Sequence, residues 1–464
     1  MQRQKHTIIF EPVPAQAMAG ICGGSKEGMD LINGNQVGRE SYFGRFLRIS
    51  YPSLSPGTGL ESINRAAVQV LLASMNRLEN TNGKVKVDLW HWIRHEMFLA
   101  TTEAIYGPHN PFRCAANEDA WYEFEEGIML LLMKMHKLSP QGRSSFKARE
   151  MLVQEFSRYY EQGHHRIPGI PNLCLVQACY NFNVSQGLPL NDIARSELGH
   201  VASRVSNTIP GAFWMLWHVI SDTTVLADCR TEIEQVVTIN VVQQKGTDGQ
   251  IFEKEVHTID LSQLTNRRVC PVIMSTWYEV LRYNHVGISA RVVTSDTRLD
   301  RYLLKKGSTT MVVGSVMHSD VSAWGPSATE FNHLRFLKND GPSDSQITPD
   351  SNRKSIPHAK NHTDNINPEK GPANRLFGGG SSLCPGRHLA SQEILSLLAL
   401  TIMRFDLRPV SGQSWIPPKK VIPLPTALPI PKATYSGHLD IEIVTRHPGR
   451  EWRVVFGKEN LADT

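Results

Sequence analysis

The sequence contains few cysteines, and no two of them are spaced as Cys-x-x-Cys. The chain has seven cysteines among 464 residues. Their number is odd and their spacing is irregular, which argues against a framework of disulfide bonds and against a zinc ribbon. A reducing, cytosol-facing environment therefore fits this sequence best.

Long apolar runs are also absent. The two longest stretches without a charged residue are 167–191 and 205–221, and prolines, amides and His218 interrupt them. A helix that crosses a bilayer needs about 20 predominantly apolar residues. The sequence therefore predicts no transmembrane segment in this chain, and its first residues do not form a signal peptide.

The sequence has no dense block of lysine or arginine and no repeat of fixed period. There are 49 Lys and Arg residues against 44 Asp and Glu residues, which leaves a net charge of +5. So small an excess, spread over the chain, argues against nucleic acid as a partner but is compatible with docking of an acidic protein. Because 41% of the residues are hydrophobic, the chain can bury a large core.

Helical spacing of apolar residues dominates the chain, and the strand-like pieces are short. We expect helices over 60–81, 85–107, 118–137, 142–162, 192–222, 267–283 and 384–403. We expect strands over 7–10, 290–293 and 310–316. The polar stretch 338–376 is typical of a flexible, solvated loop. The predicted fold class is mainly α with small β-sheets, without the strand–helix alternation of a nucleotide-binding sheet.

Cys384 differs from the other cysteines in its sequence surroundings. Cys384 lies among glycines, directly before an apolar helix, in the segment Phe377-Gly-Gly-Gly-Ser-Ser-Leu-Cys384-Pro-Gly386. Glycines let the backbone approach a flat ligand, and the free amides and dipole of a helix start favour negative charge. We therefore expect a lowered pKa for the Cys384 thiol, and a thiolate that can bind haem iron. The alternative is a buried structural cysteine beside a glycine-rich turn.

The order Phe-x-x-Gly-x-x-x-Cys-x-Gly resembles the haem-binding signature of the cytochrome P450 family, and Phe377, Gly380, Cys384 and Gly386 match it. Two residues before the cysteine, the family usually has an arginine or histidine that binds a haem propionate, whereas this chain has Ser382. The resemblance implies that the four matching residues bind haem b and that Cys384 is the axial ligand of its iron.

Two further motifs lie upstream in the order of the family. Glu279-x-x-Arg282 is by itself an ordinary helical ion pair, but ahead of the cysteine motif it resembles the structural Glu-x-x-Arg pair of P450 proteins. The segment Leu334-Arg335-Phe336 resembles the end of the Pro-x-Arg-Phe motif, with His333 in place of the proline. The resemblance implies a buried structural network of Glu279, Arg282 and Arg335.

The resemblance extends from about residue 60 to the end of the chain. It implies a cytochrome P450 fold, with haem between a long central helix and the cysteine loop with its C-terminal helix. Residues 1–464 would then form a single catalytic domain. We expect that the membrane anchor and first strands of eukaryotic members are missing from this chain. A full-length form with an anchor would lie at the endoplasmic reticulum membrane.

The predicted helix over 192–222 contains Pro210, which distorts a helix near Ser206 and Asn207. In the family this helix crosses the haem and usually carries an acid followed by threonine, which supply protons. Here Ser206 and Asn207 align with those positions. Asn-Thr-x-Pro resembles the branch with sterol 7- and 12-hydroxylases, prostacyclin synthase and fungal relatives, which implies that Asn207 and Thr208 handle oxygen and water. A kinked core helix is the alternative.

Arginines are the expected partners of haem propionates. Arg291 has the family position of such a partner, although a surface strand arginine fits its sequence equally well. Arg94 in Trp90-x-x-x-Arg94 and Arg65 after Asn64 are further candidates, and the sequence favours neither. Metal-ligand spacing is absent around four histidines, which we expect to be ordinary ones: His95, His164, His165 and His388.

The resemblance implies a haem-thiolate monooxygenase that uses O2 to oxidise a lipophilic small molecule. Electrons would come from NADPH through NADPH–cytochrome P450 reductase, docked on the cysteine side near Arg387. We expect Phe213, Ile288 and Ala290 to line the substrate side. Kinship with fungal members implies secondary metabolism, and the protein is expected to be a monomer.

Three other functions stay open. Because the acid and the alcohol are missing from the central helix, the enzyme could be a haem-thiolate isomerase or dehydratase that needs no external electrons. It could also be an inactive, truncated relative that binds no haem. A cysteine hydrolase is the most distant alternative, since Cys384 has no histidine partner in a recognisable pattern.

Overall fold

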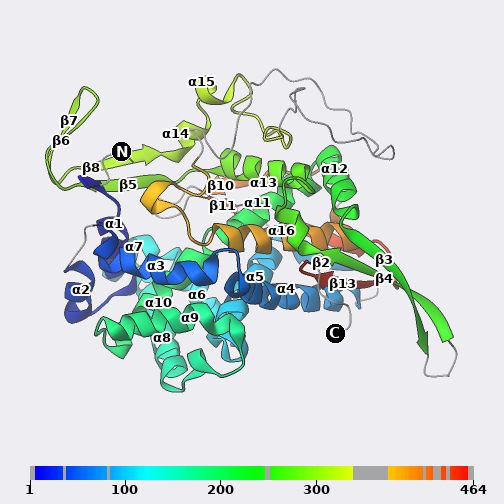
Figure 1. Ribbon diagram of the computed structural model, residues 1–464, viewed down its shortest axis with the longest axis horizontal. Helices are drawn as coiled ribbons and strands as arrows, with labels where there is room; N and C mark the ends of the chain where they lie inside the picture. Colours follow the sequence, from blue (N-terminus) through cyan, green and yellow to red (C-terminus); the bar gives the residue numbers. More distant parts are fainter. Residues whose placement is uncertain are drawn as a thin grey trace.

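Helices make up most of the structure (Figure 1). This computed structural model describes residues 6–34, 38–80, 84–245, 251–337, 375–410, 414–421, 430–434 and 439–457. The α-helices are α1 (Pro12–Cys22), α2 (Lys26–Asn33), α3 (Tyr42–Leu54), α4 (Thr58–Glu79), α5 (Leu89–Tyr106), α6 (Ala115–Glu126), α7 (Ile128–Leu132), α8 (Pro140–Glu161), α9 (Cys174–Ser185), α10 (Leu190–Val205), α11 (Thr208–Ile220), α12 (Thr223–Glu234), α13 (Pro271–Asn284), α14 (Gly314–His318), α15 (Val321–Trp324) and α16 (Arg387–Arg404).

Short strands form small sheets around these helices. The three-stranded sheets are β1 (Ile8–Ile9), β5 (Ile288–Val293) and β8 (Thr309–Val313); β2 (Lys84–Asp88), β12 (Asp440–Thr445) and β9 (Phe405–Pro409); and β13 (Glu451–Val455), β4 (Ile251–Asp260) and β3 (Val237–Lys245). The two-stranded sheets are β6 (Thr297–Leu299) with β7 (Tyr302–Leu304), and β10 (Lys419–Val421) with β11 (Lys432–Thr434). The β3–β4 hairpin projects from the molecule at the right of Figure 1. The predicted class, mainly α with small sheets, is confirmed.

Helix α11 lies in the middle of the molecule and packs against α5, α12, α13 and α16 (Figure 1). Every residue from Thr208 to Trp217 is buried, as expected for a helix that is apolar on all sides. Gly211 permits the close approach of its neighbours. A Cβ atom there would lie 3.1 Å from Ile394 of α16 and 3.3 Å from Trp277 of α13.

The single helix predicted over 192–222 is wrong, because the structure has two helices there. α10 ends at Val205 and α11 begins at Thr208, with a turn between them. The physical reason is Pro210, which has no N–H to donate to the carbonyl of Ser206. The break between the two helices therefore falls where the sequence predicts a distortion.

Other predicted elements also have different bounds in the structure. The helix expected over 85–107 starts with β2, because Val85 and Val87 alternate with charged residues and pair with β12. The helix expected over 118–137 is divided into α6 and α7, and the strand expected over 310–316 ends at Val313. The loop expected over 338–376 lies outside the described residues, apart from its last two.

Within the described residues, no helix is both long and apolar enough to cross a membrane. The most apolar stretch belongs to α11, which has only 13 residues. A span needs about 20.

Helix α16 carries a buried carboxyl group at Glu393, which is 1% exposed. The hydroxyl of Thr101 donates to its Oε2 at 3.1 Å, while its Oε1 has no hydrogen-bond partner among the described residues. Burial raises the pKa of Glu393 from 4.5 to about 8. At neutral pH this group is therefore protonated in the folded protein and ionised in the unfolded chain.

We predict that Glu393→Gln stabilises the protein increasingly as the pH rises. Between the unfolded pKa of 4.5 and the folded pKa of about 8, unfolding of the wild type releases a proton, so its stability falls. The amide cannot ionise, and its advantage grows to about 3 kcal/mol near pH 7. Urea unfolding at about pH 5 and about pH 7 measures this difference. Glu161→Gln, an exposed control, should show no such trend, and an equal effect of Glu393→Gln at both pH values would contradict the prediction.

Candidate active site

Cys384 lies in a loop that closes on itself before α16 begins. Its amide donates to the carbonyl of Phe377 at 2.9 Å. Gly378 has a φ of +78°, and a Cβ atom there would lie 2.5 Å from the carbonyl oxygen of Ser382. Only glycine fits this position, both by conformation and by space. We refer to residues 377–386 as the cysteine loop.

The Cys384 sulfur lies at the start of α16 and accepts hydrogen bonds from the amides of Gly386 and Arg387. These bonds and the charge of Arg387 stabilise a thiolate. Burial has the larger effect, however, and it raises the pKa of Cys384 above its ordinary value. The lowered pKa predicted from the sequence is therefore wrong for the free side chain, since the position of a helix start does not reveal desolvation.

Arg291 of β5 reaches the cysteine loop. Its Nη2 donates to Ser382 Oγ and its Nη1 donates to Ser289 Oγ, both at 2.7 Å. The side chain is buried, so it is not a surface strand arginine. Burial and the nearby charge of Arg375 lower the pKa of Arg291. A site that disfavours an isolated cation in this way favours an anion beside it.

The other two candidate arginines contact aromatic rings. The Arg94 guanidinium lies 3.7 Å from the centre of the Tyr122 ring. The Arg65 guanidinium lies 5.0 Å from the centre of the Phe456 ring, near the end of the described chain. No contact found in the described residues joins either of them to the cysteine loop. Of the arginines that the sequence offers as propionate partners, the structure brings Arg291 to the loop.

Phe213, expected on the substrate side, is fully buried among aromatic rings of the core. Its ring centre lies 5.4 Å from that of Trp90 and 5.3 Å from that of Trp214. Ile288 and Ala290, the other two residues expected there, are half-buried on β5. These ring contacts of Phe213 are those of a packing residue.

The four histidines expected to be ordinary ones do not gather at one site, and only His164 and His165 are neighbours in the chain. His95 pairs with Glu118 at 2.9 Å. His165 packs against the ring of Tyr180, and burial lowers the pKa of His388. In the part of the chain that the structure describes, no group of three or more potential metal ligands is found.

Asn207 and Thr208 lie at the break between α10 and α11. The Thr208 hydroxyl donates to the carbonyl of Arg204 at 2.6 Å, so its hydrogen is already used within the chain. The side-chain oxygen of Asn207 is buried and has no hydrogen-bond partner in the described structure. A buried polar atom without a partner is costly. Asn207 therefore has an unused acceptor at the break, whereas Thr208 has no hydroxyl hydrogen left to donate to a ligand or water.

Sequence reasoning missed two charged residues at this break. Ser206 Oγ donates to Glu125 Oε1 of α6 at 2.5 Å, and Lys432 Nζ of β11 lies 2.6 Å from Glu125 Oε2. Glu125 is 81 positions from Ser206 and 307 positions from Lys432. No local pattern in the sequence could have connected residues so far apart.

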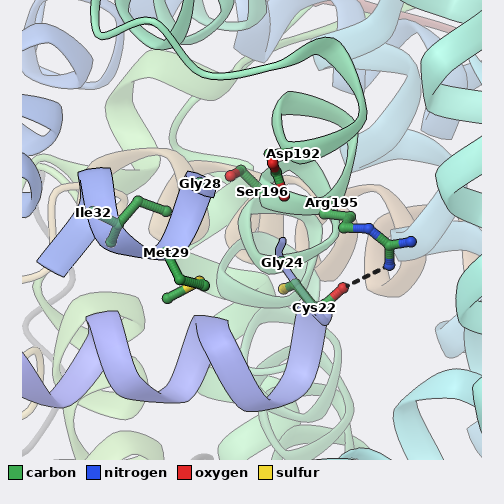
Figure 2. A pocket seen from close by; sticks show the side chains of 8 residues that line it. All are labelled: Cys22, Gly24, Gly28, Met29, Ile32, Asp192, Arg195 and Ser196. Atoms are coloured by element: carbon green, nitrogen blue, oxygen red, sulfur yellow. Dashed lines mark hydrogen bonds between the residues drawn. The ribbon is translucent and has the colours of Figure 1, made fainter. Parts of the chain in front are cut away.

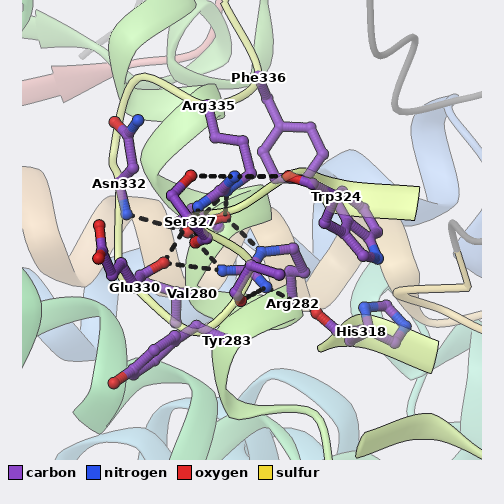
Figure 3. Close-up of polar contacts among 12 residues, drawn as sticks. Val280, Arg282, Tyr283, His318, Trp324, Ser327, Glu330, Asn332, Arg335 and Phe336 are labelled. Atoms are coloured by element: carbon purple, nitrogen blue, oxygen red, sulfur yellow. Dashed lines mark hydrogen bonds and ion pairs between the residues drawn. The ribbon is translucent and has the colours of Figure 1, made fainter. Parts of the chain in front are cut away.

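Glu279, Arg282 and Arg335 form a buried network. Figure 3 shows the two arginines among the residues that they contact. Arg282 donates to both carboxylate oxygens of Glu279 at 2.8 Å, and Arg335 Nε lies 3.1 Å from each of them. The two arginines also donate to backbone carbonyls, among them those of His318 and Ser327, and Arg335 donates to the Ser327 hydroxyl group as well. The contacts expected from the sequence are present, and they tie α13 to the segment before Phe336.

Trp277 connects this network with the cysteine loop. It lies on α13, as Glu279 does, and its Nε1 donates to Ser391 Oγ of α16 at 3.0 Å. Its ring centre is 6.3 Å from that of Phe377 in the loop. The position of the loop therefore depends on where the Glu279 network holds α13.

A small cavity outside the cysteine loop lies between α1, α2 and α10 (Figure 2). Its volume is about 10 Å³, which is room for about one water molecule. Arg195 Nη1 donates to the Cys22 carbonyl at its edge, at 3.2 Å. The cavity is too small for an organic substrate.

Comparison with known proteins connects these features. The cytochrome P450 family profile matches residues 54–433, a span that contains the Glu279 network, the helix break and the cysteine loop. The chain belongs to the cytochrome P450 family. The family membership expected from the motifs is thereby confirmed.

Fungal P450 proteins are among the relatives of this chain. Cytochrome P450 monooxygenase nodJ of Hypoxylon pulicicidum is 30% identical over 421 residues, which cover 90% of this chain and 74% of nodJ. A cytochrome P450 monooxygenase of Gibberella zeae is 29% identical, over 88% of this chain and 73% of its own. Cholesterol 7-alpha-monooxygenase of Cricetulus griseus is 25% identical over 48% of this chain and 40% of that enzyme.

A solved structure shares the fold. Retinoic acid bound cyanobacterial CYP120A1 superposes with a TM-score of 0.65, over 96% of this chain and 86% of that one, at 17% sequence identity. The P450 fold predicted from the sequence is thereby confirmed.

P450 enzymes hold haem through a cysteine thiolate, and the residues at the cysteine loop fit that group. Cys384 would provide the sulfur, next to the amides of Gly386 and Arg387. Haem iron in contact with it would supply the positive charge that stabilises the thiolate. Arg291, buried next to Ser382, offers a positive charge at the loop for a haem carboxylate.

We predict that Glu279→Gln strongly destabilises the protein. The amide keeps the shape of the side chain but leaves two buried guanidinium groups without a countercharge, at a cost of about 3 kcal/mol or more. The midpoint of urea unfolding measures the loss. Glu330→Gln is the matched control, because the Glu330 side chain is exposed and only its carbonyl contacts the network. Equal midpoints for the two variants would contradict the prediction.

Proposed function

We propose that this P450 is a haem b monooxygenase that oxidises a lipophilic small molecule with O2 and with electrons from NADPH. Cys384 is the axial ligand of the iron in this proposal, within a binding loop that includes Phe377, Gly380 and Gly386. The observation that carries the proposal is the position of Cys384, whose amide closes the loop on the Phe377 carbonyl and whose sulfur lies at the start of α16, next to the amides of Gly386 and Arg387.

Haem with a thiolate ligand supplies the chemistry that cleaves the bond between the two oxygen atoms of O2. The chain controls the strength of that ligand. Hydrogen bonds from Gly386 and Arg387 withdraw charge from the sulfur, and such bonds tune the potential of a bound metal. Arg291 would neutralise a haem carboxylate, a contact that Ser382 helps to orient.

On the substrate side, we assign different roles to Asn207 and Thr208. The side-chain oxygen of Asn207 has no partner in the described structure, so it can orient a water molecule or a substrate hydroxyl group. Thr208 holds the carbonyl of Arg204 and stabilises the start of α11. An amide is not a proton donor of carboxylic strength, so protons must come from another group.

A lipophilic substrate is supported by two comparisons. One relative is named as a cholesterol monooxygenase, and the solved structure that shares the fold is a complex with retinoic acid. The fungal origin of the nodJ and Gibberella zeae relatives supports a role in fungal secondary metabolism. Both assignments are proposals for this chain.

NADPH–cytochrome P450 reductase is the proposed electron donor. It would dock on the side of the cysteine loop, where Arg387 contributes positive charge and where electrostatic steering speeds association. We propose that the catalytic domain works as a monomer, and that a form with an anchor lies on the endoplasmic reticulum membrane and faces the cytosol.

Isomerisation or dehydration without external electrons is the second candidate, because Ser206 and Asn207 stand at the helix break in place of the usual acid and threonine. The names of the relatives favour monooxygenation. Product formation that requires NADPH and reductase supports the first candidate. Conversion of a peroxide substrate in their absence supports the second.

We predict that the reduced wild-type protein shows the carbon monoxide difference band typical of thiolate-ligated haem, and that Cys384→Ala loses it. The reason is that alanine offers no ligand to the iron. Cys114→Ala, at an exposed cysteine, should keep the band. A normal band in Cys384→Ala would remove the ligand assignment, and a wild type that takes up no haem would favour the inactive relative.

A further inference from the structure

Three polar side chains from distant segments meet at the break between α10 and α11. The Ser206 hydroxyl donates to Glu125 Oε1 at 2.5 Å, and the Lys432 ammonium group lies 2.6 Å from Glu125 Oε2. One oxygen of the Glu125 carboxylate therefore contacts Ser206 and the other contacts Lys432. We refer to Lys432, Glu125 and Ser206 as the Glu125 relay.

The relay runs from partial exposure into the core. The Lys432 side chain is 26% exposed and that of Glu125 is 8% exposed, while Ser206 is 2% exposed. Burying a carboxylate in the interior is expensive unless it is paired and hydrogen-bonded. A buried ion pair of this kind is weak evidence for stability alone, so its position calls for an explanation.

Its inner end, Ser206, directly precedes Asn207 in the chain, and the side-chain oxygen of Asn207 has no hydrogen-bond partner in the described structure. The outer end is fixed to the same helix by another route, because Trp214 Nε1 of α11 donates to the carbonyl of Pro431, directly before Lys432, at 2.8 Å. Both ends of the relay thus keep a defined position relative to α11. No other carboxylate has a contact with Ser206 in the described part of the chain.

We propose that Glu125 is a positioning residue that passes protons from solvent to the helix break through Ser206. The inference rests on the proposed monooxygenase function, in which one atom of O2 leaves as water and protons are consumed together with the electrons from NADPH. Asn207 cannot supply those protons, and the hydroxyl hydrogen of Thr208 is bound to Arg204.

The transfer returns every group to its starting state. Lys432 gives a proton to the Glu125 carboxylate and regains one from water. The Glu125 carboxyl group then turns so that its protonated oxygen faces Ser206, and the Ser206 hydroxyl group turns its hydrogen from Glu125 toward the break. The carboxyl group donates to Ser206 Oγ, while the hydroxyl hydrogen of Ser206 moves on to the acceptor at the break. One proton enters from solvent for each proton delivered, and no oxidant or reductant is consumed in the relay itself.

The test uses haem-loaded protein and two substrate-independent measurements. Hydrogen cyanide is protonated at neutral pH and binds ferric haem as the anion, so its proton must pass to a nearby acceptor. The rate of cyanide binding, followed by absorbance, therefore reports proton transfer without turnover. The second measurement is the share of NADPH electrons that ends in hydrogen peroxide when the reductase is present.

We expect Glu125→Gln to bind cyanide about tenfold more slowly than the wild type, or slower still, because a positioned acid or base usually accelerates proton transfer by at least this much. The peroxide share should rise, while the carbon monoxide band stays. Glu125→Asp should recover part of the rate because it restores a carboxylate. Glu126→Gln, an exposed neighbour on the same helix, should behave as the wild type.

Ser206→Ala removes the hydroxyl group at the inner end of the relay, and we expect the same slow cyanide binding and raised peroxide share. This variant tests the relay if Glu125→Gln does not keep haem. Cyanide binding at the wild-type rate in either variant, with the carbon monoxide band retained, would overturn the relay and leave the proposed function standing. Absence of the band in the wild type would instead remove the proposed function, and the relay with it.

Discussion

The buried carboxylate of Glu279 is the interaction on which the arrangement around the cysteine depends. Arg282 and Arg335 share it, and neither guanidinium group can turn to solvent. Since the carboxylate belongs to α13, the pair holds that helix against the segment before Phe336. Trp277 of the same helix then contacts both α16 and the cysteine loop. A charge network outside the cysteine loop thus helps to determine where the Cys384 sulfur lies.

The cysteine loop illustrates how burial and hydrogen bonding compete. The amides at the start of α16 favour a charged sulfur, but desolvation of Cys384 exceeds their effect. A free thiolate is therefore not the resting state of this side chain, and a cation beside it changes the balance. Burial also disfavours the charged form of Arg291, and together with the charge of Arg375 it lowers the pKa of this guanidinium group. An anion in contact with Arg291 would compensate for this effect. The loop and the strand arginine together suit a ligand with a cationic centre and anionic edges.

At the break in the central helix, Asn207 and Thr208 have different hydrogen-bonding roles. Asn207 keeps a polar atom free for a ligand, whereas the Thr208 hydroxyl supports the backbone. A carboxylate is nevertheless close, because α6 brings Glu125 to Ser206. A neighbouring element can therefore supply a carboxylate that the central helix lacks, provided that packing holds the two within hydrogen-bond distance.

The sequence by itself was enough to predict the cysteine loop, the Glu279 motif and the helix distortion at Pro210. The residues concerned are neighbours in the chain or belong to a motif of fixed order. Tertiary structure decided which arginine meets the loop and which carboxylate faces Ser206. These outcomes depend on packing between segments up to 307 positions apart, and on desolvation, which raised the pKa of Cys384 where the helix start alone predicted the reverse. Neither the packing of distant segments nor desolvation can be recognised from a short stretch of sequence, because both arise only when side chains far apart in the chain exclude water from one another.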